Sequence, residues 1–127
     1  MALLDHNEAE ANRIINELGD PGVAYVGSKN AVARAARGRA MAWGNAGVRL
    51  NAVAPGTTKT PMLQRGLDDP ATGDRIRALP CPLGRDGEPD EIAAVVAFLL
   101  GPQASYIHGA VYYVDGGIDA ALRPDRF

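Results

Sequence analysis

The most informative stretch of this sequence is Ala24-Tyr25-Val26-Gly27-Ser28-Lys29-Asn30-Ala31. Tyr25 and Lys29 are four residues apart, so in a helix their side chains leave the same face about one turn apart. An ammonium beside a phenol favours the phenolate form, and a tyrosine in that setting can exchange a proton with an alcohol or carbonyl oxygen. The same spacing also arises by chance on solvated helix faces, so its meaning depends on the rest of the chain.

Composition and charge are those of an ordinary globular domain. The chain has 127 residues, of which 46% are hydrophobic and 22% charged, and its net charge is -2. This charge gives no electrostatic reason to expect nucleic acid or an acidic membrane as a partner. No apolar run reaches the roughly 18 residues of a membrane span, and the N-terminus lacks the pattern of a signal peptide. Cys81 is the one cysteine, which excludes an internal disulfide, so we expect a cytoplasmic protein.

Hydrophobic periodicity and turn residues divide the chain into helices and strands. Helices are predicted over residues 7–18, 23–43 and 88–100, with short helical pieces over 62–66 and 73–79 and an irregular tail from 123 onwards. Mostly apolar strands are predicted over residues 48–54 and 110–114, each followed by a glycine-containing turn. This order of elements is typical of an α/β fold with parallel strands.

Two strands are too few for a parallel sheet, which needs several strands and cover on both faces. The helix predicted over residues 23–43 also carries small residues that allow another backbone to approach closely: Ala24, Gly27, Ala31, Ala35 and Ala36. The sequence contains no obvious neighbour for that surface. Residues 1–127 are therefore expected to form a single partial domain.

Three motifs follow one another along the chain. They are Tyr25-Val26-Gly27-Ser28-Lys29; the segment Val48–Gly56 followed by Thr60; and Leu83–Ala93 followed by Ile107–Ala110 and Val114–Gly117. In this order they resemble the C-terminal half of the short-chain dehydrogenases/reductases. The resemblance implies the C-terminal part of a Rossmann-type, doubly wound parallel sheet whose N-terminal nucleotide-binding half is absent. It also implies hydride transfer between a nicotinamide cofactor and an alcohol or ketone.

The resemblance also implies roles for individual residues. Tyr25 would be the general acid/base, and Lys29 would favour its phenolate and hydrogen-bond the cofactor ribose, so both would contact the cofactor. Pro55 and Gly56 follow a strand, and open α/β sheets bind ligands at the carboxyl ends of their strands. There the family holds the nicotinamide carboxamide, which implies that role for Thr58 and Thr60. Ordinary turn hydrogen bonding is the alternative for both threonines. The implied cofactor is NAD(H), slightly preferred, or NADP(H).

Other chemically reactive residues have simpler interpretations. Asp115-Gly116-Gly117 is typical of a turn, and Cys81, between two prolines, of packing. His6 and His108 are far apart without a third ligand nearby, so no metal site is expected. Residues 62–79 correspond to the family's substrate loop, and a plain surface loop is the alternative.

Several parts of the family pattern are absent from this sequence, namely the glycine-rich phosphate loop and the catalytic serine. Ser28 adjoins Lys29 and would project differently from Tyr25, so it cannot replace that serine. The stretch before Tyr25, Ala42-Trp43-Gly44 and Gly117-Ile118-Asp119-Ala120 resemble bacterial hydroxysteroid dehydrogenases and carbonyl reductases. This resemblance implies a hydroxysteroid or xenobiotic carbonyl substrate. We expect an oxidoreductase that is inactive until a missing N-terminal half completes it. The alternative is a non-catalytic association module or truncated relic, and exposed edges predict self-association into a homo-oligomer.

Overall fold

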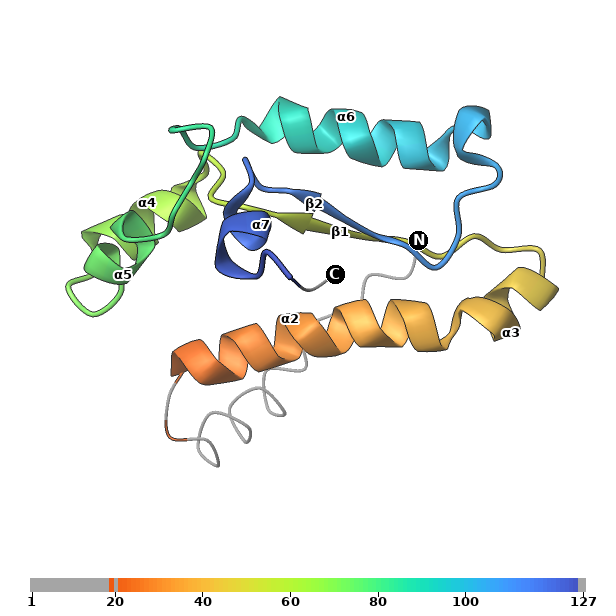
Figure 1. Cartoon of the computed structure of the whole chain (residues 1–127), viewed down its shortest axis with the longest axis horizontal. Coiled ribbons are helices and arrows are strands. Elements are labelled where there is room, and N and C mark those ends of the chain that lie inside the picture. Colours follow the sequence, from red (N-terminus) through yellow and green to blue (C-terminus); the bar gives the residue numbers. More distant parts are fainter. Residues whose placement is uncertain (1–18, 20, 126–127) are drawn as a thin grey trace.

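The computed structural model describes residue 19 and residues 21–125 (Figure 1). The helix expected over residues 7–18 lies outside this part of the chain. The described elements are α2 (Pro21–Gly38), α3 (Ala40–Asn45), β1 (Ala52–Pro55), α4 (Pro61–Asp68), α5 (Gly73–Arg77), α6 (Pro89–Leu100), the 3-10 turn η1 (Pro102–Ala104), β2 (Val111–Val114) and α7 (Ile118–Leu122).

Strands β1 and β2 form a parallel pair, as the sequence predicts. The register places Ala52 beside Val111 and Pro55 beside Val114. Backbone bonds extend the ladder at both ends, because the Ala52 amide donates to the Ala110 carbonyl (2.9 Å) and the Gly56 amide to the Val114 carbonyl (3.0 Å). Helix α6 belongs to the crossover between the strands, which makes the unit a β-α-β arrangement.

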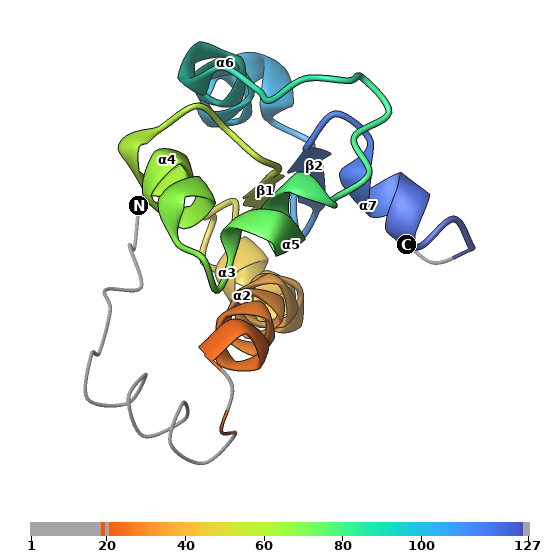
Figure 2. The ribbon, with the colours of Figure 1, turned by 90° about the vertical axis from the view of Figure 1, so that its left-hand side faces the viewer.

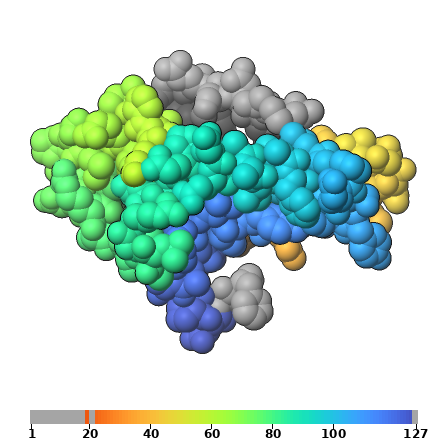
Figure 3. Space-filling view, turned by 90° about the horizontal axis from the view of Figure 1, so that it is seen from above, coloured from red at the N-terminus to blue at the C-terminus, as the bar shows by residue number. Residues whose placement is uncertain are grey.

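Helices lie on both faces of this small sheet. Figures 1 and 2 show α6 on one face and α2 on the other, and α6 contacts both strands while α2 contacts β1. Helices α4 and α5 pack together beyond the carboxyl end of β1. Seen from above, α6 crosses the upper surface and α4 and α5 project at one end (Figure 3). Cover on both faces is what a parallel sheet requires.

Little of this structure is a closed core. Among the described residues, the buried hydrophobic side chains are Ala24, Ala36, Leu99, Ala104 and Ile118. Large apolar side chains remain exposed on both helical layers, including Val26 on α2 and Leu100 on α6. This exposure agrees with the expectation of a partial domain, because helices that flank a two-stranded sheet have few side chains to pack against.

The helix expected over residues 23–43 is divided in two. Helix α2 starts at Pro21 and ends at Gly38, and α3 starts at Ala40. The Arg39 amide still donates to the Ala35 carbonyl (3.0 Å), so the two helices continue one another with only a local interruption. The interruption falls at Arg39, directly after Gly38, whose low helix propensity weakens the helix at this point.

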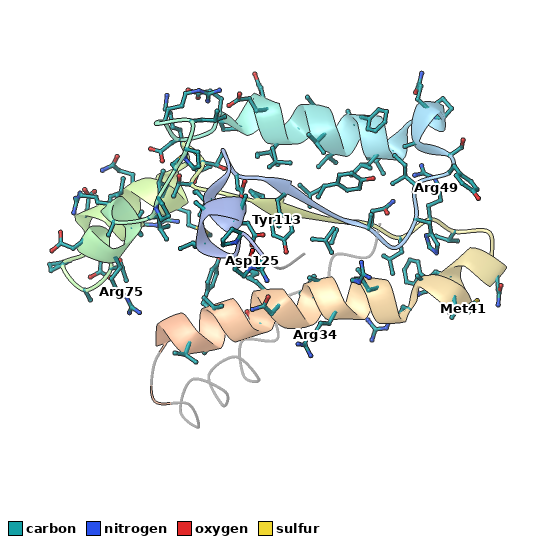
Figure 4. All side chains as sticks on the ribbon, viewed as in Figure 1. Arg34, Met41, Arg49, Arg75, Tyr113 and Asp125 are labelled. Atoms are coloured by element: carbon teal, nitrogen blue, oxygen red, sulfur yellow. The ribbon has the colours of Figure 1, made fainter. Side chains whose placement is uncertain are left out.

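The strand predicted over residues 48–54 is wrong for its first four residues, since β1 covers Ala52–Pro55. The Val48 amide donates to the Trp43 carbonyl (2.9 Å), and the Leu50 amide donates to His108 Nδ1 (2.9 Å). Arg49 lies at this entry to β1 and donates through Nη2 to the Gly101 carbonyl (3.4 Å; Figure 4). The backbone before Ala52 is therefore bonded to the ends of helices and to a loop histidine.

The structure contains helix α7, which the sequence pattern does not predict. Asp115 organises its start, accepting bonds from the amides of Gly117 (Oδ1, 2.9 Å) and Asp119 (Oδ2, 2.7 Å). Gly116 and Gly117 have φ angles of 64° and 90°, a region that favours glycine. The Asp115-Gly116-Gly117 segment is thus a turn, as predicted, and it leads into a short helix.

Candidate functional site

Tyr25 and Lys29 lie on α2, where the helix brings them to the same face. The Lys29 ammonium lies 5.3 Å from the centroid of the Tyr25 ring, within the range of a cation–π contact. The Tyr25 side chain is 58% exposed, so its surroundings are open to solvent in this chain. The expected side-by-side geometry of phenol and ammonium is therefore present on an uncovered helix face.

Ser28 does not direct its hydroxyl toward the Tyr25 phenol. Ser28 Oγ donates to the Tyr25 backbone carbonyl (2.7 Å), a bond back to its own helix. This geometry agrees with the expectation that Ser28 cannot take the part of a catalytic serine.

Pro55 and Gly56 occupy the carboxyl end of β1, where the two strand ends come very close. A Cβ atom on Gly56 would lie 2.6 Å from the Asp115 Cα, a distance that real side chains do not tolerate. Glycine is therefore required at position 56 for the chain to leave β1 next to β2. The segment that follows, residues 57–60, carries both predicted cofactor threonines.

The two threonines have local hydrogen bonds that leave part of each hydroxyl available. Thr58 Oγ1 donates to the Gly56 carbonyl (3.0 Å), so its oxygen can still accept. Thr60 Oγ1 accepts from the Leu63 amide (3.2 Å) as the N-cap of α4, so its proton can still be donated. Both threonines thus make the turn hydrogen bonds expected in the alternative interpretation. These bonds still allow a carboxamide ligand, because its NH₂ can donate to Thr58 Oγ1 and its carbonyl can accept from Thr60 Oγ1.

Two open pockets flank the carboxyl end of the sheet, and neither is lined by Tyr25, Lys29, Thr58 or Thr60. The larger, of about 540 Å³, lies between α6 and the turn after β2 and includes Thr57, Arg85, Glu91, Tyr113 and Asp115. The smaller, of about 340 Å³, lies between α4–α5 and residues 81–86. The predicted residues therefore form two groups, one on α2 and one after β1. Neither of the two pockets joins these groups.

A strong ion pair stands at the start of α6. Arg85 Nη1 and Nη2 donate to Glu91 Oε2 (2.8 Å) and Oε1 (2.7 Å), a bidentate arrangement. The Arg85 bond, followed by a bond from the Glu88 amide, lowers the pKa of Glu91 from 4.5 to about 2. This pair is not among the residues predicted from the sequence. The Glu88-x-x-Glu91 spacing was the available signal, as it is typical of a helix start with a reciprocal cap.

Cys81 and His108 make structural contacts. Cys81 Sγ donates a hydrogen bond to the Arg85 carbonyl (3.2 Å). The same sulfur would lie 2.8 Å from a Cβ atom on Gly116. His108 Nδ1 accepts from the Leu50 amide, so the proton lies on Nε2, which is 2.7 Å from the Ala40 carbonyl. In the part of the chain that the structure describes, no group of three His, Cys, Asp or Glu residues could hold a metal ion.

With this geometry established, comparisons with known proteins identify the family. A family model described as "Enoyl-(Acyl carrier protein) reductase" matches residues 10–119. The chain belongs to the short-chain dehydrogenase/reductase family, whose members related to it are oxidoreductases. The structure is accordingly the C-terminal part of a Rossmann-type sheet, as predicted.

The similar proteins include several dehydrogenases. The whole chain is 54% identical to the 3-alpha-hydroxysteroid dehydrogenase/carbonyl reductase of Comamonas testosteroni and covers 50% of it. It is 44% identical to galactitol 2-dehydrogenase (L-tagatose-forming) of Cereibacter sphaeroides, over 73% of this chain and 36% of that protein. The chain thus spans half or less of the length of these relatives.

Solved structures show the same relation. The 3-alpha-hydroxysteroid dehydrogenase from Pseudomonas sp. B-0831, complexed with NADH, superposes with a TM-score of 0.88 at 50% identity. The match covers 95% of this chain and 48% of that one. A putative 2-deoxy-d-gluconate 3-dehydrogenase from Agrobacterium tumefaciens with bound NADP gives a TM-score of 0.67 at 35% identity, over 79% and 39% of the two chains.

No helix among residues 19 and 21–125 has the length and apolar character needed to span a membrane.

Proposed function

We propose that residues 1–127 are the proton-transferring part of a nicotinamide-dependent dehydrogenase that interconverts an alcohol and a ketone. The observation that carries this proposal is the Tyr25–Lys29 pair, with the ammonium 5.3 Å from the ring centroid on one face of α2. The similarity to the Comamonas testosteroni protein, at 54% identity over the whole chain, supports a hydroxysteroid or another carbonyl compound as substrate.

Tyr25 moves the proton in this proposal. During reduction its phenol gives a proton to the carbonyl oxygen as the carbonyl carbon accepts a hydride, so the ketone becomes an alcohol. During oxidation the phenolate takes the alcohol proton. The Lys29 ammonium stabilises that phenolate. When bound, the nicotinamide cofactor supplies or takes up the hydride.

The residues after β1 fit the nicotinamide end of the cofactor. Thr58 retains an acceptor and Thr60 a donor, which are the groups that a carboxamide needs for its NH₂ and its carbonyl. Lys29 is exposed and has donors for a ribose hydroxyl. The NADH complex of the Pseudomonas relative, at 50% identity, supports NAD(H) over NADP(H).

The phosphate end of the cofactor needs a partner that this sequence does not encode. A glycine-rich loop before a helix, which cradles phosphates with backbone amides, is absent from the sequence. We therefore place activity in a complex with an N-terminal half that supplies this loop and a serine. An alternative is a non-catalytic association module, which the exposed apolar side chains favour.

Complementation separates the two functions. The N-terminal half of the Comamonas testosteroni relative, co-expressed with this chain or fused before it, should give NADH-dependent reduction of ketones. This chain alone should give little or none. Stable association of the two halves without turnover, against an active full-length relative as control, would favour the association module and contradict the enzymatic proposal.

A further inference from the structure

The segment that carries the candidate cofactor threonines is tied to a residue far along the chain. The Lys59 amide donates to the Gly87 carbonyl (2.9 Å), and the Gly87 amide donates to the Thr57 carbonyl (2.8 Å). These two bonds make a parallel bridge between Thr58 and Gly87 outside the two strands. The backbone on both sides of Thr58 is therefore held by Gly87.

The Glu91 carboxylate bonds the residues on either side of Gly87. That carboxylate accepts two bonds from the Arg85 guanidinium, and its Oε2 also accepts from the Glu88 amide (2.8 Å). Arg85 precedes Gly87 and Glu88 follows it, so one carboxylate bridges the chain on either side of the glycine. We call Arg85, Gly87, Glu88 and Glu91 the Gly87 clamp.

The Thr58 hydroxyl and the Glu91 carboxylate lie on the same side of Gly87. A Cβ atom on Gly87 would lie 3.8 Å from Glu91 Oε2 and 3.8 Å from Thr58 Oγ1, so carboxylate and hydroxyl approach the same point. A second link comes from Lys59, whose ammonium pairs with the Glu88 carboxylate. The Thr57–Lys59 segment is thus attached to the clamp by two backbone bonds and one ion pair.

The Arg85–Glu91 ion pair fixes the orientation of its groups more than it stabilises the fold. The Arg85 and Glu91 side chains are 52% and 44% exposed, and pairs so exposed add little to the free energy of unfolding. A bidentate guanidinium–carboxylate contact nevertheless fixes orientation, because both of its bonds must align at once.

We propose that Arg85 and Glu91 are positioning residues that orient Thr58 for the cofactor by holding Gly87. The role of Thr58 rests on the proposed function, whereas the mechanical link from Arg85 to the Thr57–Lys59 segment does not. The two parts are therefore tested by separate measurements.

The first measurement is amide hydrogen exchange in the 127-residue chain. Arg85→Ala and Glu91→Gln should speed exchange of the Lys59 and Gly87 amides about tenfold, as expected when one or two hydrogen bonds weaken. The Ala52 and Gly56 amides, which bond the carbonyls of Ala110 and Val114, should keep their rates. Asp90→Asn is the matched control, because it removes a carboxylate from the same first turn of α6 and should change none of the four.

Two results would overturn the clamp. One is an unchanged rate at Lys59 and Gly87 in both variants. The other is an equal increase at all four amides, which would mean that the pair acts on the whole fold.

The second measurement uses the chain completed by the N-terminal half of the Comamonas testosteroni relative. Arg85→Ala should raise the KM for NADH about tenfold with kcat changed less than about twofold, since a binding contact is lost. Arg85→Lys should recover part of the KM, because lysine can make one of the two bonds. An unchanged KM would overturn the positioning role proposed for Arg85. A completed wild-type protein without turnover would instead contradict the proposed function and leave the exchange experiment as the test of the clamp.

Discussion

One turn of α2 sets the relative position of the Tyr25 and Lys29 side chains. It does not shield them from solvent. Tyr25 is more than half exposed, and water competes with any alcohol or carbonyl for its hydroxyl. Proton transfer is most effective where water is excluded and the substrate oxygen is held within hydrogen-bond reach. The pair therefore needs a cover over the exposed face of α2 before it can act as proposed.

Replacing the phenol tests the proton-transfer role directly. In the completed protein, Tyr25→Phe keeps the ring and its contact with Lys29 but removes the transferable proton. The rate should fall about 10²–10⁴-fold, the usual contribution of general acid/base catalysis. Steady-state ketone reduction measures it, and Tyr106→Phe, which changes an exposed tyrosine elsewhere, should have no effect. Near-normal turnover of Tyr25→Phe would remove the proton-transfer role.

Replacing the ammonium should affect cofactor binding as well as rate. Lys29→Met removes a charged donor, and hydrogen bonds of charged groups contribute enough for a roughly ten- to hundredfold rise in the KM for NADH. Tyr25→Phe should leave that KM nearly unchanged. Arg34→Met is a suitable control, because Arg34 is exposed on α2 and points away from the sheet (Figure 4). Equal KM values for Lys29→Met and wild type would exclude a ribose contact.

Among the elements, α6 has the most strongly organised start. Pro89 occupies its first turn, Asp90 and Glu91 place acidic groups where the helix dipole favours them, and Glu91 returns a bond to the Glu88 amide. Arg85 then joins the loop before the helix to the same carboxylate. This start is ordered by groups within seven residues of one another. It connects to the segment after β1 through the backbone of Gly87 and through the Lys59–Glu88 ion pair.

The acid titration of Glu91 should report this arrangement. Because the Arg85 and Glu88 bonds hold its pKa at about 2, below 4.5, the stabilisation from Glu91 is complete above about pH 5. It should be lost as the pH falls from there toward about 2. Carboxyl NMR measures the midpoint directly, and Arg85→Ala should move it upward toward 4.5. A midpoint near 4.5 in the wild-type chain would contradict the bidentate pair.

For the molecule as a whole, the sheet is the incomplete part. Within the described residues β1 pairs only with β2, and its opposite edge and the apolar surfaces of both helical layers are uncovered. Exposed strand edges and apolar patches promote association. The length of the relatives, about twice that of this chain for the Comamonas testosteroni protein, agrees with a fold that other residues complete.

The chain by itself should therefore self-associate. Light scattering should show an average mass that rises with concentration, and the N-terminal half of the Comamonas testosteroni relative should reduce it by covering the same surfaces. Leu100→Lys, which places a charge on an exposed apolar position of α6, should lower association, whereas Gln103→Lys should not. A monomer that persists at high concentration would contradict this account.

Local pattern was enough to predict the α/β class, α6, β2 and the shared face of Tyr25 and Lys29. Each of these features depends on periodicity, caps or spacing within a few residues. Contacts with residues far away in the sequence left these features as predicted. The same pattern predicted a turn at Asp115-Gly116-Gly117, because glycine there can adopt positive φ.

Contacts between distant residues settled the rest. β1 begins at Ala52 because the Leu50 amide donates to His108 Nδ1, a residue far along the chain. The start of α7 is the exception, because the Asp115 carboxylate accepts from the nearby amides of Gly117 and Asp119, and this local bonding was missed. The attachment of Thr58 to Gly87 arises only after the chain has passed from β1 through α4 and α5 to the loop before α6. Hydrogen bonds of this kind join groups far apart in sequence, so no local pattern encodes them.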